Sequence, residues 1–407
     1  MSSVSDRAGA PSASPIPGVT ARAALLITVC VLAFNLRTPM MAVAPLLETI
    51  RLDLGLSSVS AGFITTLPVI CFGVLSPLAP VIARRIGLDL TLLVAIGTLA
   101  TGVAIRIGQP ILMLYLGTLL VGAGIAMMNV LLPAFIKREA PDRMGMMTSL
   151  YTMLLNAGAA LGAALSVPVM ERTGWGWRPS LGIWLLPALI GVAVVIPWTL
   201  RARRNRAPGA TLPVRKGLWG SPLAWHITIA MGTQSMVFFS VASWLPTMLQ
   251  DNGMSETRAG AILSLMTLAG LGGSFITPIL ANRTRQQSWL APITTVACVL
   301  PLIGFTVAPT TFTILWAVLL GFGLGMALSL MLITMILRTP DAHRASELSG
   351  MAQGVGYLLA STGPIIAGAL HDLTGGWTLP FWFIIALFIP FSISAWLSGR
   401  NRMVPAE

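Results

Sequence analysis

Long runs of apolar residues recur along the whole chain, separated by short polar stretches. Each run is long enough for a helix to cross a hydrocarbon core, which takes ~20 residues. The runs are continuous and do not alternate with period two, which favours helices and excludes a transmembrane β-barrel. The pattern therefore predicts an all-α membrane protein with twelve transmembrane helices, over residues 23–48, 58–82, 89–108, 110–136, 145–170, 179–200, 221–249, 257–281, 289–308, 311–337, 346–371 and 377–398.

The composition supports membrane insertion and excludes several classes of function. Of the 407 residues, 55% are hydrophobic and 9% are charged, and the mean hydropathy is +0.84, whereas a soluble domain is ~25% charged. The net charge of +12 lies in short connections between the spans, which indicates membrane orientation and no nucleic-acid partner. The three cysteines fall inside apolar runs, and no hydrolase or nucleotide-binding motif occurs. We expect no metal site, no cofactor and no enzymatic activity.

The basic residues predict an orientation. Twelve spans place both termini on one side of the membrane, and most of the 25 basic residues fall on that side. Because loops rich in Lys and Arg stay in the cytoplasm, both termini are predicted to be cytoplasmic.

The chain divides into two similar halves. The stretches 80-PVIARR-85 and 278-PILANR-283 are related by an offset of 198 residues (278 − 80), as are 55-GLSSVSAG-62 and 253-GMSETRAG-260 (253 − 55). Both halves run in the same direction, as in transporters that bind substrate near the midplane between two parallel repeats. The predicted organisation is a disordered cytoplasmic N-terminus (1–20), a six-helix bundle (21–200), a cytoplasmic linker (201–220), a second six-helix bundle (221–399) and a cytoplasmic tail (400–407).

Four stretches carry a family resemblance: 35-NLRTPM-40, 122-GAGIAMMNVLLPAFIKRE-139, 221-SPLAWHITIAMGTQS-235 and 348-LSGMAQGVGYLLASTGP-364. They resemble the bacterial cyanate/2-nitroimidazole transporter family, a branch of the major facilitator superfamily. The resemblance covers residues 23–398. It implies two pseudo-symmetric six-helix bundles (the major facilitator fold), a location in the bacterial inner membrane as a monomer, and movement of small weakly acidic or anionic solutes.

The resemblance also points to a gating region between the second and third spans. Arg84, Arg85 and Gly87 match part of the superfamily signature there, whereas its Asp is displaced or lost. Arg84 and Arg85 are therefore expected to act in conformational gating.

Arg37 is the one charge that the sequence places deep inside a span. All 13 acidic residues fall at the termini, in loops or near helix ends, so none lies at its depth. An arginine at the centre of a membrane helix costs about 2.5–3.5 kcal/mol. It needs backbone carbonyls and polar side chains, water in a cavity, or an anionic substrate. A guanidinium suits the last partner, because its donors meet carboxylate-like or nitro oxygens in pairs.

Other polar and aromatic residues at mid-depth are candidates for the same cavity. Helical spacing places Phe34, Thr38 and Met41 beside Arg37 on one face of the first span. The candidate substrate-binding residues are Arg37, Phe34, Thr38, Met41, Asn129, Tyr151, Asn156, Gln234, Phe238, Gln353 and Tyr357; the candidate gating residues are Arg84, Arg85 and Trp244, of which Trp244 also suits an interfacial aromatic belt.

These residues predict a secondary active or facilitative transporter that moves a small anionic, weakly acidic or nitro-bearing solute by alternating access. No carboxylate or histidine of a proton relay lies at depth, so a coupled proton would have to travel on the substrate. Two alternatives remain: a drug efflux transporter for neutral compounds, and a sensor that binds a solute without moving it.

Overall fold

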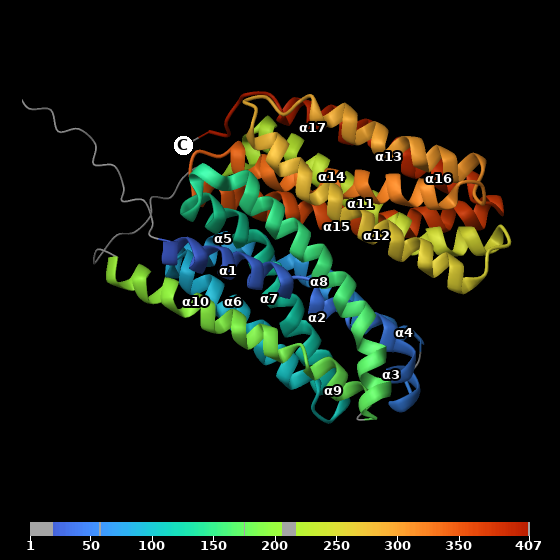
Figure 1. The fold of residues 1–407 in the computed structure, drawn as a ribbon, viewed down its shortest axis with the longest axis horizontal. Helices are drawn as coiled ribbons and strands as arrows, with labels where there is room; N and C mark the ends of the chain where they lie inside the picture. The colour runs from blue at the N-terminus through green and yellow to red at the C-terminus, as the bar shows by residue number, and fades with distance from the viewer. Residues whose placement is uncertain (1–18, 57, 175, 206–216, 406–407) are drawn as a thin grey trace, which may run out of the picture.

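The computed structural model describes residues 19–56, 58–174, 176–205 and 217–405 (Figure 1). The predicted N-terminal segment 1–20 and the predicted linker 201–220 lie mostly outside these ranges. Within them every regular element is a helix. The first half contains α1 (Val19–Asn35), α2 (Thr38–Met41), η1 (Ala44–Leu46), α3 (Leu47–Asp53), α4 (Ser58–Leu75), α5 (Leu78–Ile86), α6 (Leu88–Arg106), α7 (Ile111–Glu139), η2 (Pro141–Arg143), α8 (Met144–Thr173), α9 (Trp177–Gly182) and α10 (Leu185–Asn205). The second half contains η3 (Leu218–Gly220), α11 (Pro222–Asp251), α12 (Glu256–Asn282), α13 (Leu290–Val307), α14 (Thr313–Leu337), α15 (Ala342–Thr374), α16 (Thr378–Ala386) and α17 (Phe388–Ser398).

The helices match the predicted spans. In the described part of the chain, 10 helical segments are long and apolar enough to cross a membrane, and the bent pair α4–α5 makes up to 11. These segments correspond to all the predicted spans except the one at 346–371. That span is α15, a 33-residue helix that packs against α11 but is not among the segments apolar enough to meet this criterion.

Prolines break several of the predicted spans. Helix α1 ends at Asn35 and α16 ends at Ala386, each four residues before a proline, Pro39 and Pro390. A proline has no N–H to donate, and its ring clashes with the carbonyl four residues earlier, which ends the helix there. The first span is therefore not the continuous helix that the sequence predicted, and this break changes which residues face the cavity.

The two halves form two groups of helices that meet at one end (Figure 1). They lie together at the end where the C-terminus lies, here called the terminal end, and separate towards the other, here called the open end. Helix α8 packs on α12, and α15 packs on α4 and α7. Small residues permit the close approach: a Cβ added to Gly145 would lie 2.5 Å from Asn282, and one added to Gly350 would lie 2.8 Å from Pro80.

The internal repeat has a counterpart in the hydrogen bonding. In the first half, Trp177 Nε1 donates to Asp53 Oδ2 at 2.9 Å; in the second, Trp377 Nε1 donates to Asp251 Oδ2 at 2.7 Å. The aspartates are 198 residues apart (251 − 53), which is the offset of the sequence repeat. Equivalent contacts thus fasten the open end of each half.

Candidate functional site

The break in the first span positions Arg37. The residue lies between α1 and α2, directly before the first residue of α2. Its side chain is only 7% exposed, and its Nε is buried without a hydrogen-bond partner. Across the described ranges, no acidic residue forms an ion pair with it. Arg37 is therefore a buried cation with unused donor capacity.

A cavity lies directly against this guanidinium. The cavity is partly open to solvent. Five of the predicted residues line it together: Arg37, Asn156, Gln234, Phe238 and Tyr357. The other lining residues are Ser235, Phe239, Met266, Thr267, Gly270, Gly321, Leu324, Gly325 and Leu328. Among the described lining residues, Arg37 and Asn156 come from the first half and the others from the second, so a bound solute would contact both halves at once.

The two amides in the cavity already donate to the protein. Asn156 Nδ2 donates to Ser274 Oγ and to the Thr152 carbonyl, both at 3.0 Å. Gln234 Nε2 donates to Ser235 Oγ at 2.7 Å and to Met231 Sδ at 3.5 Å. An amide nitrogen carries two N–H groups, so both are engaged in each residue. What these amides retain is acceptor capacity, which suits a solute that carries an N–H or O–H.

Aromatic rings form one wall of the cavity. The rings of Phe238 and Phe239 are 5.5 Å apart, and those of Phe239 and Tyr357 are 6.4 Å apart. Tyr357 also packs at 5.2 Å from Phe72 of the first half. Tyr151 is 1% exposed and lies within electrostatic reach of Tyr357 and Arg37, although it is not among the lining residues. The site thus combines one cation with a flat apolar face.

Three predicted residues of the first span lie outside the cavity. Thr38 Oγ1 donates to the Phe34 carbonyl at 2.5 Å and packs against Gly158 of α8. The Phe34 ring lies 6.4 Å from that of Trp184. Met41 is half-buried at the end of α2. The spacing argument that grouped them with Arg37 assumed a continuous helix, and it fails because the helix breaks between Asn35 and Thr38.

Two further predicted residues join the halves. Gln353 Nε2 donates to the backbone carbonyl of Asn129 at 2.9 Å and to Ser349 Oγ at 2.7 Å. Both side chains are buried, and Asn129 Nδ2 has no partner among the described residues. The structure thus places them at the contact between α7 and α15 and not among the residues that line the cavity.

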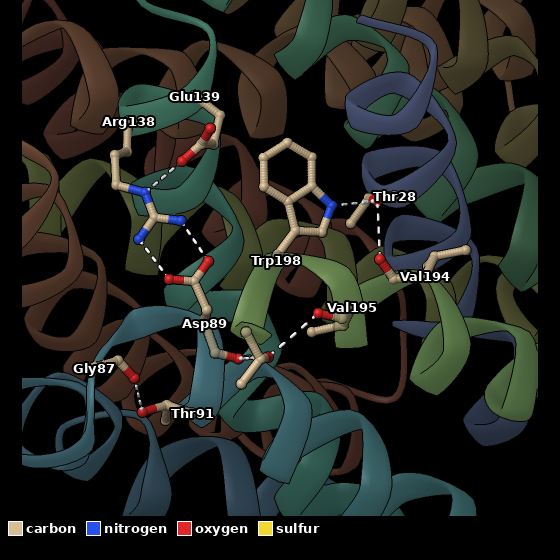
Figure 2. A network of polar contacts seen from close by, with 10 residues as sticks. Thr28, Gly87, Asp89, Thr91, Arg138, Glu139, Val194, Val195 and Trp198 are labelled. Carbon is tan, nitrogen blue, oxygen red and sulfur yellow. Dashed lines mark hydrogen bonds and ion pairs between the residues drawn. The ribbon is translucent and has the colours of Figure 1, made fainter. Parts of the chain in front are cut away.

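The predicted gating arginines lie at the terminal end. Arg84 of α5 forms an ion pair with Glu347 of α15 at 3.7 Å, across the two halves. Arg85 is exposed on the same helix. Asp89 lies two residues after Gly87, in the first turn of α6. Figure 2 shows its two oxygens accepting from Arg138 Nη1 at 2.8 Å and Nη2 at 2.5 Å, within the first half.

Trp244 lies at the open end of the second half. Its Nε1 donates to the Pro364 carbonyl at 2.8 Å, and its ring lies 5.5 Å from that of Trp377. These contacts hold α11 to α15 and to the start of α16, all within one half.

Arg106 is a second buried charge, near the end of the predicted span 89–108. Its side chain is 0% exposed, Nη1 donates to the Pro39 carbonyl at 2.7 Å, and Nη2 donates to the Leu181 carbonyl at 3.2 Å. Arg37 is therefore not the only cation inside the bundle.

A family model described as "Major Facilitator Superfamily" matches residues 25–364. The chain belongs to this superfamily. It is a multi-pass membrane transporter and not an enzyme.

Curated relatives place the chain in one branch of the superfamily. It is 37% identical to an uncharacterized transporter, YycB, of Bacillus subtilis (93% of this chain, 94% of the relative). It is 35% identical to the 2-nitroimidazole transporter of Escherichia coli (94% and 97%) and 28% identical to the cyanate transport protein CynX of the same organism (88% and 93%). The family resemblance seen in the sequence is thereby confirmed.

A solved structure supports the fold. The superfamily transporter FucP, in its outward conformation, aligns with a TM-score of 0.72 at 13% identity, over 92% of this chain and 98% of FucP. The likeness confirms the predicted major facilitator fold.

Proposed function

We propose that this transporter moves a small anionic, weakly acidic or nitro-bearing solute by alternating access, with Arg37 as the central binding charge. The observation that carries the proposal is the buried guanidinium on the cavity wall, with no acidic partner in the described part of the chain. A charge in such a place is costly, and an anionic solute supplies the missing partner. The relatives named for 2-nitroimidazole and cyanate support this class of solute.

The remaining groups favour a flat solute with one ionisable or polar edge. Arg37 meets a negative or nitro oxygen, the oxygens of Asn156 and Gln234 accept from an N–H or O–H, and Phe238 and Tyr357 cover the ring. A nitroheterocycle with a ring N–H offers all three features, an aromatic carboxylate offers the charge and the ring, and cyanate offers only the charge. We therefore rank flat aromatic weak acids above cyanate.

The orientation and domain boundaries belong to the same proposal. We place both termini in the cytoplasm of a bacterial inner membrane, the two bundles at 21–200 and 221–399, and the linker at 201–220, with a monomer as the transporting unit. The open end then faces outward. The basic residues near the terminal end support this assignment.

The test is counterflow in proteoliposomes with 2-nitroimidazole, benzoate, cyanate and a neutral aromatic amide. Arg37→Gln keeps hydrogen bonding but removes the charge, and we expect it to abolish counterflow of the acids. Arg37→Lys keeps the charge without the paired donors and should retain a weak activity. Arg172→Gln, an exposed arginine at the open end, is the matched control and should behave as wild type. Undiminished transport by Arg37→Gln would refute the anion site; preference for the neutral amide would favour the drug-efflux alternative, which the apolar wall also fits.

A further inference from the structure

The terminal end of the second half carries a second polar pocket, which shares no lining residue with the cavity at Arg37. It lies between the start of α13 and the end of α17 and is partly open to solvent. Trp289, Trp396, Arg400 and Arg402 line it. Both tryptophans are partly exposed, at 38% and 45%, as expected of indole rings at a membrane–water interface.

Buried contacts hold the two walls of this pocket together. Gln287 N donates to the Gly399 carbonyl at 2.7 Å, and Ser288 Oγ donates to the Trp396 carbonyl at 2.9 Å. Arg338 is 3% exposed beneath them and donates to the carbonyls of Ser398 at 3.2 Å and Gly399 at 2.9 Å. These hydrogen bonds fix the backbone at the end of α17, and therefore the position from which Arg400 and Arg402 extend.

The C-terminal segment is part of that frame. Val404 N donates to the Arg338 carbonyl at 2.9 Å, and the Val404 side chain is 2% exposed. The chain between Gly399 and Val404 therefore lies folded back on the bundle, with Arg400 and Arg402 exposed on it.

The charge around the pocket is unbalanced. Arg283 and Arg285 are exposed in the neighbouring connection between α12 and α13. Within residues 217–405, neither these two nor Arg400 and Arg402 form an ion pair with an acidic side chain. Four guanidinium groups without an acidic partner thus lie at one corner of the bundle and make it strongly basic.

An apolar groove continues from the polar pocket along α13. It is partly open to solvent, and Ile293, Val296 and Leu300 line it together with Leu319 of α14. These three residues of α13 are 47%, 61% and 51% exposed. Ile293 lies one helical turn after Trp289, so the groove begins where the polar pocket ends.

We propose that this corner binds one anionic phospholipid, with its phosphate on Arg400 and Arg402 between the two indole rings and an acyl chain in the groove on α13. The observations combine a charged head-group pocket, an interfacial aromatic pair and an apolar groove in the order in which a lipid presents its own parts. Clusters of arginine beside a membrane helix bind anionic lipid head groups in this way. The proposal does not depend on the transported solute.

The test is native mass spectrometry of the purified full chain in detergent, titrated separately with dioleoyl phosphatidylglycerol and dioleoyl phosphatidylcholine. We expect wild type to bind the anionic lipid about tenfold more tightly. Each arginine near an anionic surface contributes roughly a fivefold factor, so Arg400→Gln/Arg402→Gln should weaken phosphatidylglycerol binding about 25-fold. All these side chains are exposed, so the variant should fold.

The matched control removes two exposed arginines from the open end, in Arg172→Gln/Arg258→Gln, and should leave binding unchanged. A second variant, Val296→Trp, fills the groove without altering charge and should also weaken lipid binding. Equal binding of both lipids by wild type, or an equal loss in the control, would overturn the proposal. Displacement of the lipid by millimolar inorganic phosphate would overturn it too, because the pocket would then serve free anions.

Discussion

Two arginines inside the first half have opposite environments. Arg106 donates hydrogen bonds to the carbonyls of Pro39 and Leu181. The buried Nε of Arg37, by contrast, has no hydrogen-bond acceptor among the described residues. The broken first span exposes the Pro39 carbonyl, because no helical N–H reaches it, and Arg106 supplies the donor. One arginine thus stabilises the break that presents the other to the cavity.

This relation predicts that Arg106 positions Arg37. In Arg106→Met, two buried carbonyls lose their donor, at a cost of about 1–3 kcal/mol each. The variant should therefore melt at a lower temperature and bind the acidic solute more weakly. Arg106→Lys, which can still reach one carbonyl, should recover part of both. Thermal unfolding in detergent and equilibrium solute binding measure the two effects.

The control for Arg106 is another buried arginine brace. Arg338 donates to carbonyls at the terminal end of the second half, so Arg338→Met should lower the melting temperature without changing solute affinity. If Arg106→Met and Arg338→Met changed affinity alike, the effect would be general destabilisation and the positioning role of Arg106 would be disproved.

The sequence could locate Arg37 but not the environment of Arg106. Arg37 stood out because it interrupts a long apolar run with no acid nearby. Arg106 lies at the end of its run, where an arginine is ordinarily solvated, and only the distant carbonyls of Pro39 and Leu181 make it a buried brace. The spacing of residues within one span does not predict contacts between spans. The two carbonyl partners of Arg106 could therefore be found only from the folded structure.

At the scale of helices, glycines set how closely α12 and α14 approach. A Cβ added to Gly325 would lie 2.1 Å from the Gly270 carbonyl, and one added to Gly321 would lie 1.9 Å from the Met266 carbonyl. Both distances involve backbone atoms, so no side chain can move aside. The same glycines line the cavity, and the helix spacing therefore also sets the cavity's shape.

Gly325→Ala is expected to force α12 and α14 apart, with lower expression of folded protein and loss of solute binding. Gly260→Ala in α12 is the control, because nothing lies within 4 Å of its added Cβ. Alanine in a helix is more favourable than glycine by about 0.5–1 kcal/mol, so the control should fold at least as well as wild type. Fluorescence-detected size-exclusion chromatography compares them; normal folding and binding by Gly325→Ala would show that the contact tolerates a methyl group.

The hydrophobic pattern did not predict where helices break within a span. The pattern located the predicted spans because apolar length is local information, but it does not distinguish a bent segment from a straight one. The prolines carried only part of the missing signal. Pro39 and Pro390 each follow a helix end by four residues, whereas Pro133, Pro246 and Pro364 lie inside unbroken helices.

At the scale of the whole molecule, the internal repeat predicted the two-bundle architecture. The polar contacts show which parts of the two halves remain equivalent and which differ. Asp53–Trp177 and Asp251–Trp377 are equivalent. By contrast, the cavity draws one cation from the first half and an aromatic wall from the second. This asymmetry follows from divergence of the two copies at mid-depth. A solute that bridges them would couple its own binding to the relative position of the halves.

Contacts at the terminal end hold the halves in the arrangement seen here. Lys137 Nζ of α7 donates to the Ile336 carbonyl of α14 at 2.5 Å, and Arg84 pairs with Glu347 at 3.7 Å. A hydrogen bond from a charged donor contributes about 1.5–3 kcal/mol, whereas a partly exposed ion pair contributes about 0.2–1 kcal/mol. Lys137→Met should therefore favour opening of the terminal end more than Arg84→Gln does. The measurement is the distance between two spin labels at positions 146 and 283, in a protein from which Cys30, Cys71 and Cys298 have been removed. Its distribution gives the populations of the closed and open terminal end.

We expect the fraction of molecules with a separated terminal end to rise from wild type to Arg84→Gln to Lys137→Met. Wild type should show mainly the short distance, Arg84→Gln a modest long-distance fraction, and Lys137→Met a larger one. A ligand shifts such an equilibrium only by its difference in affinity for the two states, so an acidic solute that bridges the halves should change these fractions in all three proteins and not in Arg37→Gln. The control Arg258→Gln, at the open end, should match wild type. A long-distance fraction in Lys137→Met no larger than in Arg258→Gln would mean that the helix packing alone, through residues such as Gly145 and Gly350, keeps the terminal end closed.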